Sequence, residues 1–87
     1  MATTQEHDML LRKRLADYLS IYSLDCTAYY DMDNLFGDEP TYIAVFTHRW
    51  NRAAVKAKLR ASKLRWQVVP HHSSVFAVDP KSLEALS

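Results

Sequence analysis

The stretch TYIAVFT, residues 41–47, is a continuous run of residues that favour β-strands. Val, Ile, Tyr, Phe and Thr are enriched in strands, and a run without polar interruption is typical of a strand covered on both faces. Alternation along a strand places Ile43 and Val45 on one side and Tyr42 and Phe46 on the other. We therefore expect a central strand whose aliphatic side packs against helices.

Outward from this run, the pattern predicts a helix on the N-terminal side and a hairpin on the C-terminal side. The expected elements are a helix from Thr3 to about Leu24, strands over Cys26–Tyr30, Arg65–Val69 and Val75–Val78, and a short helical turn that begins at Asp79-Pro80. Thr3 and Glu6 have the spacing of a capping box. Residues 31–40 are rich in helix and strand breakers and are expected to form a loop.

The order of the main elements is α-β-β-α-β-β. A ferredoxin-like fold gives this order when the chain starts at its first helix and its old ends are joined by a hairpin. The sequence therefore predicts an α+β class fold, a small two-layer α/β sandwich in which two helices cover one face of a four-stranded antiparallel sheet. The central strands would be 41–47 and 75–78, and the edges 26–30 and 65–69. We expect residues 1–87 to form a single domain.

The segment from His48 to Trp66 holds seven of the eleven Lys and Arg residues and no acidic residue. We expect a helix over residues 48–64, capped by Thr47. At about 100° per residue, five cations share one arc of this helix. They are Arg49, Arg52, Lys56, Arg60 and Lys63. Trp50 and the alanines form a second stripe, and small side chains there would allow the helix to approach the sheet closely. Trp50 would pack in the core or cover a sheet edge or, if it is exposed beside the arginines, be a candidate anchor for binding a partner.

A row of like charges at spacing i, i+4 destabilises an isolated helix, which indicates a negative surface nearby. Backbone phosphates of a nucleic acid or an acidic groove on a protein would satisfy this row. A third alternative is a solvated face that is partly neutralised by the chain's own acidic loop. The net charge of +1 weakens the nucleic-acid interpretation, because dedicated nucleic-acid binders are usually more basic.

The predicted sheet face away from the helices carries Tyr42 and Phe46, with Phe76 as a candidate neighbour. Aromatic rings on an open sheet can stack on the bases of single-stranded nucleic acids. The aromatic-glycine consensus of RNA-recognition modules is absent from the sequence. A dimer interface or ordinary core packing is the stronger interpretation of these rings.

The loop over residues 31–40 is expected to be solvated and acidic, and to offer a secondary contact for a basic partner. Its acidic residues are Asp31, Asp33, Asp38 and Glu39. The spacing does not match an EF-hand, which requires an oxygen ligand at its fifth position and glycine at its sixth. Adjacent His71 and His72 make a poor chelate in extended backbone. We expect no metal site and no cofactor.

Composition sets the remaining expectations. One cysteine, Cys26, cannot form an internal disulfide and is expected to be a buried thiol. No apolar run approaches the about 20 residues that span a bilayer, and the N-terminus has no signal-peptide pattern, so we expect a cytoplasmic protein without a membrane partner. No nucleophile, acid–base or metal set is recognisable, so we expect no enzyme.

The sequence thus favours a small non-enzymatic binding protein whose basic helix docks on a polyanionic surface, either nucleic acid or an acidic protein groove. The alternative is a phage or mobile-element type inhibitor that binds a host defence or transcription complex, in the manner of anti-CRISPR or anti-restriction proteins. That analogy rests on small size and the absence of other motifs. A homodimer through a sheet edge or the aromatic face is a further expectation.

Overall fold

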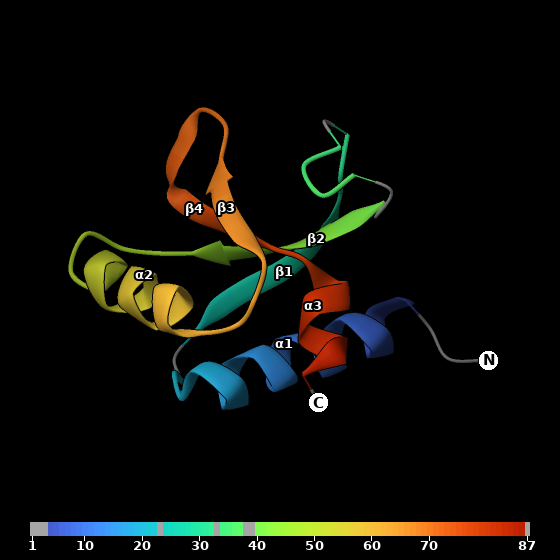
Figure 1. The fold of residues 1–87 in the computed structure, drawn as a ribbon, viewed down its shortest axis with the longest axis horizontal. Coiled ribbons are helices and arrows are strands. Elements are labelled where there is room, and N and C mark those ends of the chain that lie inside the picture. Colours follow the sequence, from blue (N-terminus) through green and yellow to red (C-terminus); the bar gives the residue numbers. More distant parts are fainter. Residues whose placement is uncertain (1–3, 23, 33, 38–39, 87) are drawn as a thin grey trace.

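The computed structural model describes residues 4–22, 24–32, 34–37 and 40–86. Seven elements follow one another along these residues (Figure 1). They are α1 (Thr4–Leu19), β1 (Asp25–Tyr30), β2 (Thr41–Phe46), α2 (Arg52–Ala61), β3 (Trp66–Val69), β4 (His72–Val78) and α3 (Pro80–Ala85). The fold is α+β, as the sequence predicts. The capping box at Thr3 lies outside the described residues.

The four strands form one antiparallel sheet in the order β1-β2-β4-β3. This is the order that a ferredoxin-like fold takes when its chain starts at the first helix and its old ends are joined by the β3–β4 hairpin. The central pair is β2 and β4, in which Ile43 lies opposite Val78 and Val45 opposite Phe76. The predicted central and edge strands are therefore confirmed.

The hydrophobic core lies on one side of the sheet, between the strands and all three helices. Its cluster joins residues of α1, α2 and α3 to the inward side chains of β1, β2 and β4. The buried members are Leu11, Leu15, Leu19, Cys26, Ile43, Val45, Val55, Leu59, Leu64, Phe76, Val78 and Leu83. The loop after β1 and the β3–β4 turn project on the side of the sheet away from α1 and α3 (Figure 1).

Helix α1 is shorter than the sequence predicts, because it ends at Leu19 rather than near Leu24. Ser20 has a φ of 58°, in the left-handed region where helices commonly terminate. Leu11, Leu15 and Leu19 are buried as expected, but Tyr22 lies beyond the helix and is 81 % exposed. The helical spacing of apolar residues in the sequence extends to Tyr22, although the helix itself ends at Leu19.

Helix α3 begins at the predicted position, with Asp79 as its N-cap and Pro80 in the first turn. The Asp79 carboxylate accepts a hydrogen bond from the Lys81 backbone N–H at 3.0 Å. Its second oxygen lies 3.8 Å from the Arg65 guanidinium. The helix carries Leu83 into the core beside α1. No helix among the described residues is long and apolar enough to cross a membrane.

Candidate functional site

Helix α2 turns a different face to the sheet than the sequence analysis predicts. Val55 and Leu59 are its buried residues, whereas all four alanines of the predicted stripe are exposed. These alanines are Ala53, Ala54, Ala57 and Ala61. The prediction was wrong because Val55 and Leu59 bury far more apolar area than alanine methyl groups, and area buried decides which face packs. The alanines instead form an outward strip.

The start of α2 also differs from the prediction. The helix begins at Arg52 with Asn51 at the N-cap position, so the predicted range 48–64 was too long at both ends. Thr47 does not cap it: its N–H and its hydroxyl both donate to the Ser74 carbonyl, at 3.0 Å and 2.6 Å. Asn51 makes no capping hydrogen bond, and the first turn contains no acidic residue.

The five predicted cations gather on α2 and the segments that flank it, and we call this set the basic pole. Arg49, Lys56, Arg60 and Lys63 are exposed and Arg52 is half-buried. Within the described part of the chain, none of the five forms an ion pair. Residues four apart on a helix rise about 6 Å, so Arg52, Lys56 and Arg60 form an evenly spaced row.

An exposed aromatic pair stands at the N-terminal end of the basic pole. The rings of His48 and Trp50 are stacked, with centroids 6.0 Å apart and planes within 6° of parallel. Trp50 is 77 % exposed, which corrects the expectation that it packs against the sheet. The Asn51 side-chain oxygen accepts a hydrogen bond from the His48 backbone N–H at 2.7 Å, which fixes this turn.

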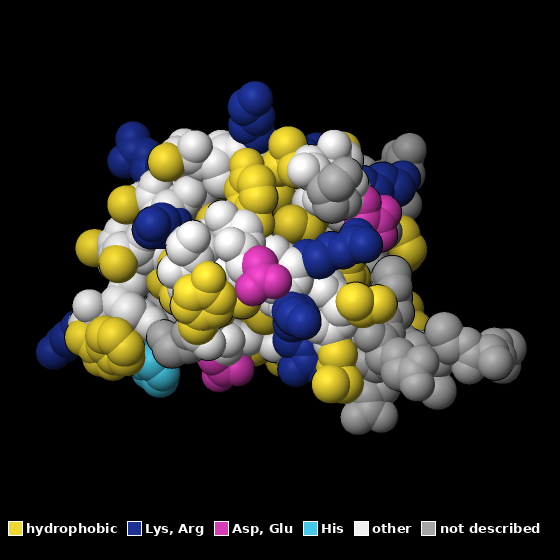
Figure 2. Space-filling view, turned by 90° about the horizontal axis from the view of Figure 1, so that it is seen from below, with side chains coloured by type: hydrophobic (Ala, Val, Ile, Leu, Met, Phe, Trp, Pro, Cys, Tyr) yellow, Lys and Arg dark blue, Asp and Glu magenta, His cyan; other side chains and the backbone are white. Residues whose placement is uncertain are grey.

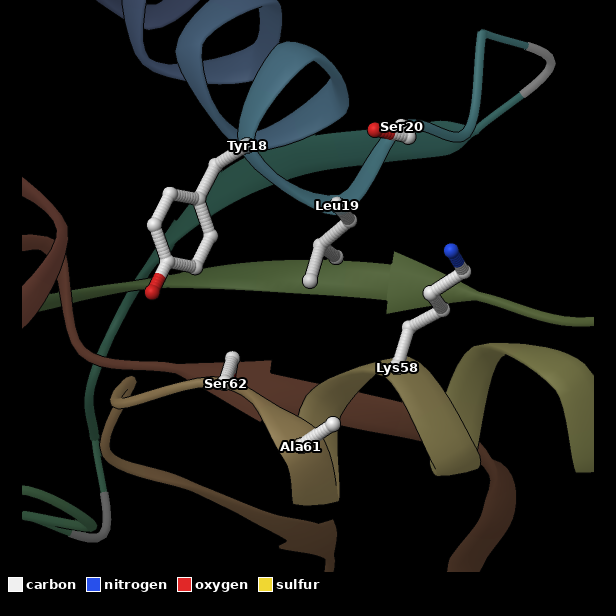
Figure 3. Close-up of a pocket in the computed structure, with 6 residues that line it drawn as sticks. All are labelled: Tyr18, Leu19, Ser20, Lys58, Ala61 and Ser62. Atoms are coloured by element: carbon white, nitrogen blue, oxygen red, sulfur yellow. The ribbon is translucent and has the colours of Figure 1, made fainter.

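A shallow pocket of about 200 Å³ lies where the C-terminal ends of α1 and α2 approach each other (Figure 3). The Lys58 side chain extends from α2 toward Ser20, and Tyr18 closes the other side. The Tyr18 hydroxyl oxygen accepts a hydrogen bond from the Lys63 backbone N–H at 3.4 Å. An ammonium group at a helix C-terminus is electrostatically favourable, which gives Lys58 a stabilising position beside α1.

The helix-bearing side of the molecule is rich in positive charge. Viewed from below, Lys and Arg side chains project around much of the outline, whereas Asp and Glu side chains are few (Figure 2). Hydrophobic side chains appear there as separate small patches rather than as one continuous surface (Figure 2). Charge therefore distinguishes this side from an ordinary apolar interface.

The opposite face of the sheet carries a cluster of three aromatic rings. Tyr42 and Phe46 lie there as predicted, and Tyr29 of β1 joins them, with ring centroids at 5.9 Å from Tyr42 and 6.2 Å from Phe46. The expectation that Phe76 belongs to this cluster was wrong. Phe76 pairs with Val45 and is fully buried in the helix-side core, where Trp66 packs edge-on against it at 5.6 Å.

The acidic loop does not reach the basic pole in its described part. Loop residues 31–40 precede β2 and α2 follows it, so the two lie toward opposite ends of this strand (Figure 1). Six residues of β-strand span about 20 Å. Asp31 is only 7 % exposed, which contradicts a fully solvated loop. Asp33, Asp38 and Glu39 lie outside the described residues.

The Cys26 thiol is poorly reactive, and the potential metal ligands of the described residues are not clustered. Burial raises the pKa of Cys26 to about 11, with Arg12 lowering it and Asp25 raising it to smaller extents. A thiol of this kind remains protonated near neutral pH and is a poor nucleophile. Among the described residues, no three His, Cys, Asp or Glu side chains are arranged to hold a metal ion.

Comparison of the chain with protein-family models, with curated proteins and with solved structures finds no match. The cations and two of the three sheet-face rings are predictable from the sequence. Tyr29 was not predicted, although the alternation of β1 relative to β2 contains that information, and neither was the His48–Trp50 stack, which no periodicity predicts.

Proposed function

We propose that this protein is a non-enzymatic binding module whose basic pole docks on the phosphate backbone of a nucleic acid. The basic pole supplies the charge, and the exposed Trp50 supplies an aromatic surface at its end. Phosphate contacts by Lys and Arg give affinity with little dependence on sequence, which suits a row of cations. Trp50 would stack on an unpaired base where one is available.

The observation that carries this proposal is the absence of ion pairs at the basic pole within the described residues. An internally neutralised helix would place a carboxylate near Lys56 or Arg60. The acidic loop instead begins at the far end of β2 in its described part. The cations therefore remain available to a partner, and no compensating charge within the described fold explains their clustering.

The test is the salt dependence of binding to single- and double-stranded DNA and RNA of random sequence. Four phosphate contacts would reduce the affinity roughly a hundredfold between 50 and 200 mM salt. Substituting Lys56→Ala together with Arg60→Ala should lower the slope of log affinity against log salt by about 1.8 for double-stranded DNA and by about 1.4 for single strands. Fluorescence anisotropy across a salt series measures both quantities.

The matched control is Lys13→Ala together with Arg14→Ala, which removes the same charge from exposed positions on α1. This control should leave the slope within half a unit of the parent value. Equal effects of the two double variants would show that only total charge matters. No detectable binding to any of the four nucleic acids at 50 mM salt would refute the proposal.

A second candidate, an inhibitor or adaptor that binds an acidic protein surface, is favoured by the outward alanine strip. Ala53, Ala54 and Ala57 are exposed on α2, Trp50 is exposed just before it, and Lys56, Lys58 and Arg60 are exposed on the same helix. Trp and Arg are the residues most enriched at the energetic centres of protein interfaces. A phage or mobile-element protein that blocks a host complex would use such a surface.

The two candidates are separated by affinity capture from a host lysate with and without nuclease. Protein binding predicts one specific partner that survives nuclease treatment and is lost from a Trp50→Ala bait. Nucleic-acid binding predicts that nuclease removes the captured material. A parallel Trp66→Phe bait, altered at the half-buried tryptophan, should capture the same partner as the parent.

A further inference from the structure

A second concave site lies on the side of the sheet away from α1 and α3 (Figure 1). It is a groove of about 350 Å³ between the chain that follows β1 and the β3–β4 turn. Its lining includes an aspartate, two tyrosines and two histidines. These lining residues are Asp31, Tyr30, Tyr42, His71 and His72, with Met32 at the rim. Both segments project on the side of the sheet away from α1 and α3 (Figure 1).

The Asp31 carboxylate is the unusual feature of this groove. The exposed fraction of Asp31 is only 7 %, so the residue is more than nine-tenths buried. Its Oδ2 atom accepts a hydrogen bond from the Phe36 backbone N–H at 3.0 Å, and this bond closes the turn after β1. Its Oδ1 atom is buried and has no hydrogen-bond partner among the described residues. A buried acceptor of this kind is costly to leave unpaired, so it indicates a missing donor.

The surroundings favour a positively charged donor. Tyr30 and Tyr42 line the groove, and tyrosine rings attract cations that lie over their faces. The Asp31 carboxylate would repel a phosphate-bearing ligand, whereas it would attract an organic cation.

We propose that this groove binds the guanidinium group of an arginine side chain, with Asp31 as its carboxylate partner. A guanidinium is planar, carries five N–H donors, stacks on aromatic rings and is weakly hydrated, so it suits a buried acceptor beside tyrosines better than an ammonium does. Oδ1 has almost no solvent-accessible surface, so binding requires a rearrangement of the groove wall, which the 87 % exposed Met32 next to Asp31 in the chain can supply.

The β3–β4 turn forms the second wall of the groove. The positive φ of His71 in this turn allows a substitution that should leave the backbone unchanged. Val69 pairs with His72 across the turn, so Pro70 and His71 are its two central residues. His71 has a φ of 67°, a value that glycine adopts without strain and histidine does not. Substituting His71→Gly should therefore preserve the turn while it removes one imidazole from the groove.

The experiment is a titration followed by amide chemical shifts, with N-acetyl-argininamide as the ligand. Its neutral isostere N-acetyl-citrullinamide and the ammonium analogue N-acetyl-lysinamide are the comparison ligands. We expect saturable shifts for the arginine compound at residues 30–36 and 69–72, and at least tenfold weaker binding of the other two. Equal binding of either comparison ligand, or shifts spread over the whole surface, would overturn the proposal.

Asp31→Asn is the decisive variant, because the remaining amide oxygen can still accept the Phe36 N–H while the charge is lost. It should weaken arginine binding at least tenfold. The matched control, Asp25→Asn, removes the same charge from an exposed position at the other end of β1 and should change the affinity less than twofold. If Asp31→Asn fails to fold, Tyr30→Ala and His71→Gly provide the measurement, and unchanged affinity in both would refute the site.

A parallel titration tests whether the arginine is presented by a protein partner or the ligand is a free guanidinium solute. A six-residue glycine-serine peptide with one central arginine is titrated under the same conditions. At least fivefold tighter binding than the single amino acid amide would indicate an arginine presented by a protein partner, and equal binding a free guanidinium solute. Binding of neither ligand at 10 mM would overturn the proposal.

Discussion

The two faces of α2 differ in what they contribute to the protein. The inner face buries only Val55 and Leu59, yet these two residues join the helix to the core. The outer face carries the alanine strip, and Trp50 stands exposed just before the helix. Burial of one leucine stabilises a fold by about 1.5–3 kcal/mol, whereas a methyl group contributes about 0.8 kcal/mol. Stability is therefore concentrated on one face and is nearly independent of the other.

This contrast separates folding from binding within a single helix. Substitutions on the inner face should change the free energy of unfolding, whereas those on the outer face should change only the affinity for a partner. A helix that was merely packed and solvated would have no reason to combine exposed tryptophan, exposed alanines and unpaired cations. The difference between the faces supports the interpretation of the outer face as a contact surface.

The largest expected effect is that of Leu59→Ala on stability. Removing this fully buried side chain leaves a cavity, so the free energy of unfolding should fall by about 2–5 kcal/mol. Urea denaturation followed by circular dichroism measures the change. The matched outer-face variant, Ala57→Ser, should change stability by less than about 0.5 kcal/mol. Losses of similar size in the two variants would contradict the assignment of the faces.

The buried side of β1 should give the protein a pH-dependent stability through Cys26. The pKa of this thiol is raised from 9.0 to about 11 by burial, so the folded protein keeps its proton while the unfolded chain ionises. The stabilisation is complete below pH 9 and is lost as the pH rises toward 11, to a total of about 2–3 kcal/mol. Urea denaturation from pH 8 to 11 measures it.

Cys26→Ala is the control for this effect, because lysines and tyrosines titrate in the same range in both proteins. The variant should show a flatter dependence of stability on pH than the parent. The parent thiol should also react with a disulfide reagent at pH 8 only as fast as the protein opens. Rapid modification of the folded protein would show that Cys26 is accessible.

The smallest expected effect on stability is that of Trp50→Ala. The side chain is mostly exposed, and its one ring contact within the described residues is with His48, so stability should change by less than about 0.5 kcal/mol. Acrylamide should quench the fluorescence of Trp50 more strongly than that of the half-buried Trp66. A blue-shifted, protected Trp50 in the free protein would indicate that its surface is already covered.

Sequence reasoning predicted the sheet well because strands 41–47 and 75–78 are the most apolar segments and must lie at the centre. Alternation along β2 also assigned its two faces correctly. Features that depend on tertiary packing were not predicted, for identifiable physical reasons. A helical projection shows which residues share a face but not which face packs, so the alanines of α2 were placed on the wrong side.

The candidate site was predictable in charge but not in geometry. The cluster of cations from Arg49 to Lys63 is visible in the sequence, and the absence of ion pairs among the described residues is not. Threonine is a residue type that commonly caps helices. The Thr47 hydroxyl instead donates its hydrogen bond to the Ser74 carbonyl, which is distant in sequence. Asp31 looks like a solvated loop residue, and only the fold shows that its carboxylate is buried beneath the turn it closes.

The uncapped first turn of α2 has a consequence for the evolution of the chain. A helix N-terminus carries about half a positive charge, and an acidic residue in its first turn adds about 0.3–1 kcal/mol of stability. Ala54 stands at the third helical position, where glutamate would supply that gain. The same glutamate would neutralise the end of the basic pole. Selection for partner binding would therefore oppose one of the simplest stabilising substitutions available to this protein.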